Sequence, residues 1–142
     1  MINRELTVGG EKRHITCVSM GNPHCVMFMD KDFPLWEFDI EKTGAPIEND
    51  DLFPEKVNVE FVKKVDGTHF EMRVWERGSG ETYACGTGAC AVIAAACKNG
   101  LCAMGEDVAV KLKGGTLTIN YSDDGIKMTG NAVTAFYGNV EI

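Results

Sequence analysis

The sequence predicts an α+β fold in which a curved, mostly antiparallel sheet wraps around one central apolar helix. The first observation is size and composition, because 142 residues, of which 44% are hydrophobic and 25% charged, suit one globular domain. The second is a succession of short strand-like segments separated by turn residues. The third is one helical segment, 88–99, whose run 89–97 is apolar on all sides and must be covered on all sides. We assign residues 1–142 to a single domain without repeats or linkers.

Nine segments have the composition or the alternation of β-strands. They are 5–8, 13–20, 25–29, 57–65, 69–77, 108–113, 116–121, 126–129 and 133–137. In 69–77, Phe70, Met72 and Val74 alternate with polar or amphipathic residues, which is typical of a half-buried strand. Turns are expected between strands at Gly9-Gly10, Gly21-Asn22-Pro23, Asp66-Gly67 and Ser122-Asp123-Asp124-Gly125.

Two segments are expected to be helical. Residues 39–48 predict a short helix, which Gly44 and Pro46 weaken. The longer helix at 88–99 should end at Lys98-Asn99-Gly100, because a cation is favourable there and Asn or Gly tolerates the left-handed cap. It is rich in small side chains that let strands approach closely, namely Ala89, Ala91, Ala94, Ala95 and Ala96.

Charge and hydropathy argue against several classes of protein. A formal net charge of −7 opposes binding to nucleic acid or to an anionic membrane. The longest apolar run, 89–97, is far shorter than a membrane span, and the first residues lack the apolar core of a signal peptide. The six cysteines form no CxxC pair and the three histidines do not lie near them at zinc-finger spacing, so we expect no structural metal. We therefore expect a cytoplasmic protein with reduced cysteines.

The segment Cys85-Gly86-Thr87-Gly88 precedes the apolar helix and predicts an anion site. The start of a helix presents unpaired N–H groups and a partial positive charge, and glycines let an anion approach the backbone. Thr87 is the expected N-cap, and the pKa of a thiol at this position should fall. A proton-transfer cysteine beside a carboxylate site is one interpretation. The alternative is that Cys85 is only a small residue in a tight turn.

Five other polar residues have both a functional and an ordinary interpretation. Arg77 could grip a carboxylate in bidentate fashion and Glu76 could accept a hydrogen bond from an ammonium group, or the two form a surface charge pair. Asn22 could bind a ligand or simply form the turn before Pro23. Asn58 is equally a candidate ligand and a satisfied core amide. His24 could tune a nearby thiol or play a structural role.

Three motifs are similar to segments in the C-terminal half of the diaminopimelate epimerases. They are ERGSGETYACGTGA at 76–89, MGNPHCV at 20–26 and VNVEF at 57–61, and the match runs in order across essentially the whole chain. Proline racemases and phenazine-biosynthesis isomerase-like proteins share the fold but differ around this cysteine. The resemblance implies an enzyme that interconverts LL- and meso-diaminopimelate, on the route to lysine and peptidoglycan, without a cofactor or a metal.

The resemblance also implies roles for individual residues. In this family one cysteine thiolate removes the α-proton of the substrate and a second cysteine delivers a proton to the opposite face. Cys85 would be one of the two, and Gly86 and Thr87 would bind the reacting carboxylate. His24 and Glu76 would help to set the acidity of the thiol. The residues that would hold the distal amino-acid end are Asn22, Asn58, Glu76 and Arg77.

One expected feature of the family is missing from this sequence. The first domain of the family supplies the partner cysteine in a GNGxRC-like motif, which does not occur here. The nearest string, GNPHC, matches a different family segment, so Cys25 is not expected to be the second base. We therefore expect a C-terminal half whose N-terminal half is absent and which is inactive alone. Apolar surface left uncovered by that half would favour self-association, for example as a homodimer.

Three rival functions remain at this point. The chain could belong to another racemase or isomerase of the same fold that acts on a different amino acid. It could be a non-catalytic module that binds amino acids or carboxylates with a single cysteine. It could also be a cysteine hydrolase, which would need a base hydrogen-bonded to Cys85, and only His24 or His69 could serve.

Overall fold

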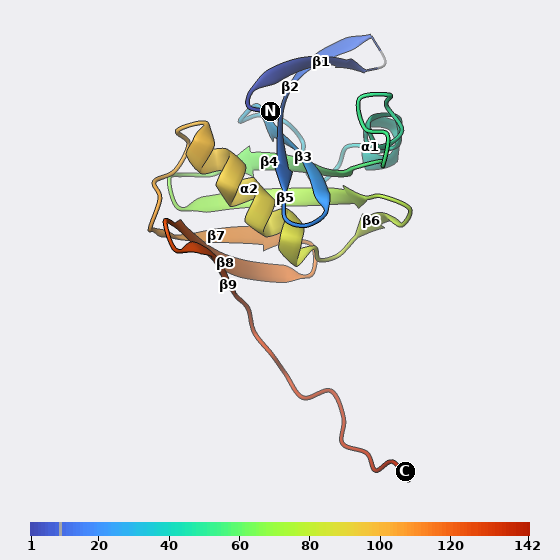
Figure 1. The fold of residues 1–142 in the computed structure, drawn as a ribbon, viewed down its shortest axis with the longest axis vertical. Coiled ribbons are helices and arrows are strands. Elements are labelled where there is room, and N and C mark those ends of the chain that lie inside the picture. Colours follow the sequence, from blue (N-terminus) through green and yellow to red (C-terminus); the bar gives the residue numbers. More distant parts are fainter. Residues whose placement is uncertain (9) are drawn as a thin grey trace.

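A computed structural model describes residues 1–8 and 10–142, and within them the chain forms one mixed sheet with a helix on each face (Figure 1). The strands are β1 (Arg4–Val8), β2 (Glu11–Ser19), β3 (Pro23–Met29), β4 (Asn58–Lys64), β5 (His69–Glu76), β6 (Gly80–Thr82), β7 (Asp107–Leu112), β8 (Gly115–Ser122) and β9 (Gly125–Thr129). The helices are α1 (Ile40–Glu48) and α2 (Gly86–Lys98). The predicted α+β class is confirmed.

The strand order in the sheet is β1-β2-β3-β4-β5-β7-β8-β9, and β6 pairs with the end of β5. Two pairings, β3 with β4 and β5 with β7, are parallel, and the other described pairings are antiparallel. Parallel neighbours need a crossover connection, since the chain must return to the same end of the sheet. The segment containing α1 makes the first crossover and the segment containing α2 makes the second.

The alternation of side chains divides the core into two layers. Val26 on β3 packs in the cluster that covers α2, whereas its neighbours Cys25 and Met27 pack in the cluster that includes Ile40 and Ile47 of α1. Successive residues of a central strand are therefore buried on opposite faces. This explains why 25–29 is continuously apolar rather than alternating.

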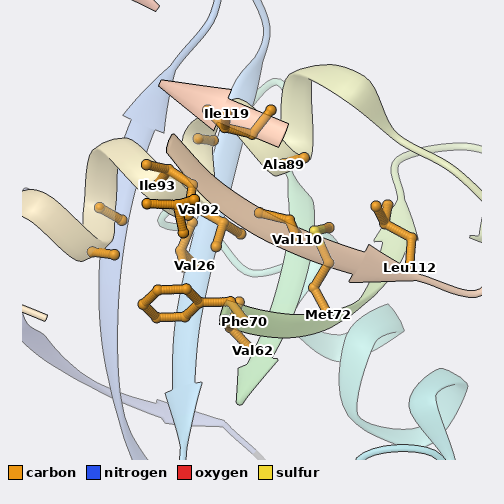
Figure 2. Packing of buried hydrophobic residues seen from close by; sticks show 14 of the residues in the cluster. Val26, Val62, Phe70, Met72, Ala89, Val92, Ile93, Val110, Leu112 and Ile119 are labelled. Carbon is orange, nitrogen blue, oxygen red and sulfur yellow. The ribbon is translucent and has the colours of Figure 1, made fainter. Parts of the chain in front are cut away.

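The sheet curves around α2, as the apolar character of that helix predicts. Residues Gly88, Ala89 and 91–96 are buried, and α2 packs against β2, β3, β4, β8 and β9. Figure 2 shows Val92 and Ile93 of α2 among the side chains of Val26, Phe70 and Val110. None of the helices in the described part of the chain is long and apolar enough to cross a membrane.

The shorter helix uses the glycine that was expected to weaken it. A Cβ atom at Gly44 would lie 2.7 Å from Cβ and Cγ of Trp75, so any larger residue would push α1 away from β5. Asp39 caps the helix by accepting a hydrogen bond from the Lys42 N–H group at 3.1 Å. Gly44 therefore lowers the intrinsic helix propensity of α1 but allows α1 to pack closely against the sheet.

One predicted strand does not form, and one observed strand was not predicted. The strand expected at 133–137 is wrong, since residues 130–142 have no regular structure and extend away from the sheet (Figure 1), with Phe136 and Tyr137 exposed. A segment of strand-forming residues becomes a strand only where it can pair with a sheet edge and pack on an apolar surface. The short strand β6 was not predicted. The hairpin turn at 122–125 is confirmed by the pairing of Ser122 with Gly125, whereas Gly9 of the first turn lies outside the described residues.

Candidate active site

Polar side chains gather on the α2 face of three neighbouring strands, near the N-terminal end of α2. Residues two apart on a strand share a face, so the polar ones continue the rows of Val26, Val62 and Val74. They are His24 on β3, Asn58 and Glu60 on β4, and Glu76 at the end of β5. His24, Asn58 and Glu60 are buried and Glu76 is half-buried.

Cys85 is itself the N-cap of α2, which corrects the prediction that Thr87 would cap the helix. Its backbone is extended, with φ −140° and ψ 100°, and its Sγ atom accepts a hydrogen bond from the Gly88 N–H group at 3.3 Å. The Thr87 hydroxyl lies 3.6 Å from the same sulfur atom. The helix therefore begins two residues before the predicted start, and Thr87, one residue inside the helix, has an exposed side chain beside the thiol.

The missing side chain of Gly88 brings the thiol and a carboxyl group together. A Cβ atom at Gly88 would lie 3.0 Å from the Cys85 Sγ atom and 3.0 Å from the Glu60 Oε1 atom. Both atoms therefore border the same small space at the first turn of α2. Gly86 is close to Met128 of β9, whose Sδ atom would lie 2.9 Å from a Cβ there.

A chain of hydrogen bonds connects the buried strand residues with the helix start. Glu60 Oε1 lies 2.5 Å from His24 Nδ1, and His24 Nε2 lies 3.1 Å from Asn22 Oδ1. The Asn22 amide then donates to the Thr87 hydroxyl at 3.4 Å. The structure thus brings Asn22, His24 and Thr87 together as functional candidates. It adds Glu60, which the sequence analysis missed although a charged residue in an apolar strand is itself a signal.

The pKa of Cys85 is raised, whereas the sequence analysis expected it to fall. Burial is the main cause, and the negative charges of Glu76 and Glu60 add to it. The hydrogen bonds from Thr87 and Gly88 act in the opposite direction but do not prevail. The expectation considered only the helix start, whereas the burial of the thiol and its closeness to Glu60 of β4 depend on the tertiary structure.

Asn58, Glu76 and Arg77 lie at the same end of the sheet but make separate contacts. Asn58 Oδ1 accepts a hydrogen bond from the Arg77 N–H group at 3.0 Å, while the exposed Arg77 guanidinium donates to the carbonyl of Glu55 at 3.0 Å. Glu76 accepts a hydrogen bond from the Thr82 hydroxyl at 2.5 Å. Asn58 therefore holds the backbone from which the Arg77 side chain projects.

Glu48 of α1 fixes the turn that follows Arg77. This buried carboxylate accepts hydrogen bonds from the Trp75 indole at 2.8 Å and from the Gly78 N–H group at 2.9 Å. Burial raises the pKa of Glu48, but these hydrogen bonds and the charge of Lys56 together outweigh burial and hold the pKa below its ordinary value of 4.5.

We expect Glu48→Gln to lower the free energy of unfolding by about 1–3 kcal/mol at neutral pH, as is usual for lost hydrogen bonds to a charged group. A carboxyl group with a lowered folded-state pKa contributes stability above its unfolded pKa, and the contribution is lost as the pH falls through the folded pKa. The difference in the free energy of unfolding between Glu48→Gln and the unmodified protein should therefore become smaller at acidic pH. Urea unfolding at neutral and acidic pH measures it, with the exposed Glu55→Gln as the matched control. A difference that stays constant with pH would contradict this role.

The other cysteines lie away from Cys85. Cys17 and Cys25 are direct cross-strand neighbours in the layer that packs on α1, and Cys90 follows in the second turn of α2. Cys97 and Cys102 lie at the opposite end of α2, with their sulfur atoms 3.4 Å apart. Cys25 is fully buried on the α1 side of the sheet, so the structure agrees with leaving it out of the site.

The candidate site is a surface rather than a closed pocket. Thr87 is exposed beside the buried Cys85, which is 8% accessible, and Arg77 is exposed at the end of β5. Two pockets of about 340 Å³ lie elsewhere, one beneath the β1–β2 hairpin against α1 and the other along β5 and β7. A small ligand bound at Cys85 would need further groups to enclose it.

Comparison with known proteins defines first the fold and then the family. A phenazine biosynthesis protein of the PhzF family from Bacillus anthracis has the same fold, with a TM-score of 0.56 and 23% identity over 88% of this chain and 40% of that one. The family model for diaminopimelate epimerase matches residues 16–135. This chain belongs to the diaminopimelate epimerase family.

Individual relatives agree with this assignment. The diaminopimelate epimerase of Leptospira biflexa is 49% identical over 100% of this chain and 49% of its own length. That of Methanococcus maripaludis is 47% identical over 100% of this chain and 50% of its own length. The chain thus spans about half the length of these relatives.

Proposed function

We propose that this chain provides one of the two acid/base cysteines, and part of the substrate site, of an enzyme that epimerises diaminopimelate. The observation that carries the proposal is the position of Cys85, whose sulfur atom caps the N-terminus of α2 beside a buried polar network in a chain of this family. The α-proton of an amino acid is weakly acidic, so its removal needs a positioned base and stabilisation of the charge that develops.

The start of α2 suits the carboxylate of the substrate. The first N–H groups of a helix have no intrahelical partners, and the Cys85 sulfur occupies that of Gly88. The N–H groups of Gly86 and Thr87 and the Thr87 hydroxyl would bind the carboxylate next to the reacting carbon. Their dipoles are fixed before the reaction, so they can stabilise negative charge that develops during proton transfer.

The distal amino-acid end of diaminopimelate would bind at the end of β5. Arg77 has an exposed guanidinium that can pair with a carboxylate, and Glu76 is an acceptor for an ammonium group. Asn22 and Asn58 would complete the contacts with their amide groups. Charges of both signs in this position favour an amino-acid end over a simple carboxylate.

Proton transfer would use Cys85 in either direction. Its raised pKa keeps the thiol protonated, ready to donate a proton, and in the opposite direction the thiolate would remove one from the same face of the α-carbon. Inversion requires a second acid/base group on the other face. The other cysteines of the described residues lie away from the site, so we propose that the second thiol comes from another part of the enzyme and that this chain alone does not invert the stereocentre.

The test joins this chain to the N-terminal half of the Leptospira biflexa enzyme and follows deuterium incorporation at the α-carbon of LL-diaminopimelate in heavy water. We expect exchange and inversion with the joined protein and neither with the chain alone. Proline is tested in parallel, because exchange of its α-proton would indicate a different substrate. Inversion by the chain alone at the rate of the joined protein would refute the proposed division, and exchange of proline instead of diaminopimelate would refute the substrate.

A further inference from the structure

Glu60 is a carboxyl group inside the apolar part of the sheet. It is 0% accessible and lies on β4 between Val59 and Phe61, both of which are also fully buried. Its Oε2 atom has no hydrogen-bond partner among the described residues. A buried carboxyl group with an unpaired oxygen stabilises the folded protein less than a buried apolar side chain of similar size. Folding alone therefore does not account for a glutamate here.

The contacts of His24 determine how many protons the pair carries. The Asn22 Oδ1 atom can only accept, so His24 Nε2 must carry a proton and donate it across 3.1 Å. Glu60 Oε1 is 2.5 Å from His24 Nδ1, a distance that requires one proton between the two atoms. The pair is then neutral overall, whether this proton belongs to the ring or to the carboxyl group.

We infer that Glu60 is a positioning residue of this site, which shares one proton with His24 and thereby holds the imidazole ring, Asn22 and the Cys85 thiol in their reactive arrangement. The inference rests on the proposed function, because it takes Cys85 as the reacting group. It adds Glu60 to the residues of the site and gives the buried Glu60–His24 pair a role in it. Glu60 acts through its neighbours and does not touch the substrate.

Two routes connect Glu60 with the thiol. The direct one is the space at Gly88, which Glu60 Oε1 and Cys85 Sγ both border at 3.0 Å from the Cβ position. The indirect one runs through His24, Asn22 and Thr87 to the same sulfur atom. The charged or titratable groups that face Glu60 are His24 from β3, Glu76 from β5 and Cys85 from α2.

The proton of the pair is held near the pH at which the enzyme would work. Burial raises the pKa of Glu60 to about 7, although the hydrogen bond and the charge of His24 act in the opposite direction. A proton that moves easily between Glu60 and His24 changes the electric field at Cys85 without adding a net charge. This allows the site to adjust as the thiol gains and loses its proton during turnover.

The experiment measures the pH dependence of Cys85 alkylation in this chain, resolved by peptide mass spectrometry, for the unmodified protein and for Glu60→Gln. Glu60→Gln removes the carboxylate that borders the same space as Cys85 Sγ and raises the pKa of that thiol, so the alkylation midpoint should shift to lower pH. Because His24 balances the charge of Glu60, the shift should be smaller than the roughly one unit expected for an isolated neighbouring charge. Glu71→Gln on β5, a half-buried carboxylate bonded to Trp36 and Lys111, is the matched control and should leave the midpoint unchanged.

Further readouts separate positioning from simple loss of structure. Unfolding would expose the fully buried Cys25. A shift in the Cys85 midpoint is therefore accepted only if the alkylation of Cys25 stays slow in the same variant. If Glu60→Gln does not fold, nitrogen-15 NMR of His24 in the unmodified protein decides. The inference requires a proton on Nε2 throughout the neutral range, and a bare Nε2 overturns it.

An unchanged Cys85 midpoint in folded Glu60→Gln overturns the inference while the joined enzyme still epimerises. Conversely, a shifted midpoint in an inactive joined protein would leave the inference standing and refute the proposed function.

Discussion

Replacing Cys85 by serine in the joined enzyme is expected to lower the rate of α-proton exchange by about 10²–10⁴-fold, the usual contribution of a positioned acid or base. A thiol titrates near 8.5, whereas a serine hydroxyl does not ionise near neutral pH, so the variant keeps the shape but loses the proton transfer. The hydroxyl can still cap α2 by accepting from the Gly88 N–H group, as the sulfur does now. Stability should therefore change little.

The matched control is Cys90→Ser, which changes a half-buried cysteine in the next turn of the same helix. It should retain the exchange rate because Cys90 packs against the core cluster and takes no part in the network. Heavy-water exchange of LL-diaminopimelate measures both variants. A Cys85→Ser enzyme that exchanges at nearly the original rate would remove Cys85 from the mechanism.

The largest expected effect on stability comes from Arg73 of β5. Its guanidinium is 7% accessible and joins three parts of the chain, since it donates to Glu81 at 2.7 Å and to the carbonyls of Leu35 and Phe38 at 2.9 Å. It also lies 4.8 Å above the ring of Phe38. Arg73→Met keeps the apolar stem but leaves the carboxylate and both carbonyls without this donor.

We expect Arg73→Met to lower the free energy of unfolding by about 3–5 kcal/mol, because two carbonyl groups lose their donor, at about 1–3 kcal/mol each, and a partly buried ion pair is broken. Lys113→Met removes the more exposed partner of the same Glu81 carboxylate, which lies at 2.8 Å, and should cost at most about 1 kcal/mol. Urea denaturation of both variants measures the difference. Equal losses would mean that the two carbonyl contacts of Arg73 contribute nothing.

Local patterns in the sequence predicted most of the secondary structure. The apolar segment at 88–99 became α2, and the alternation of Phe70, Met72 and Val74 became the α2 face of β5. These signals are local, because the period of apolar residues reports which side of an element is buried. The motif ERGSGETYACGTGA likewise identified the family that the family model confirms.

Patterns failed where the outcome depends on a distant partner. The segment 133–137 has the composition of a strand but finds no strand neighbour among the described residues, whereas 80–82 lacks a strand pattern and pairs with β5 because the chain turns back there. The predicted direction of the Cys85 pKa shift was wrong for the same reason. Its position at the helix start was predicted, but the burial of the thiol, which is the main cause of the shift, and the charge of Glu60 were not.

The sequence by itself determined that an apolar helix lies within a mostly antiparallel sheet and that Cys85 stands at the start of that helix, since both follow from residue order and period. Only the tertiary structure decided that the sulfur is the cap, that Glu60 lies 2.5 Å from His24, and that Glu60 and Cys85 border the space left by Gly88. The physical reason is that pairing between strands brings together side chains far apart in sequence, and electrostatic effects depend on those distances.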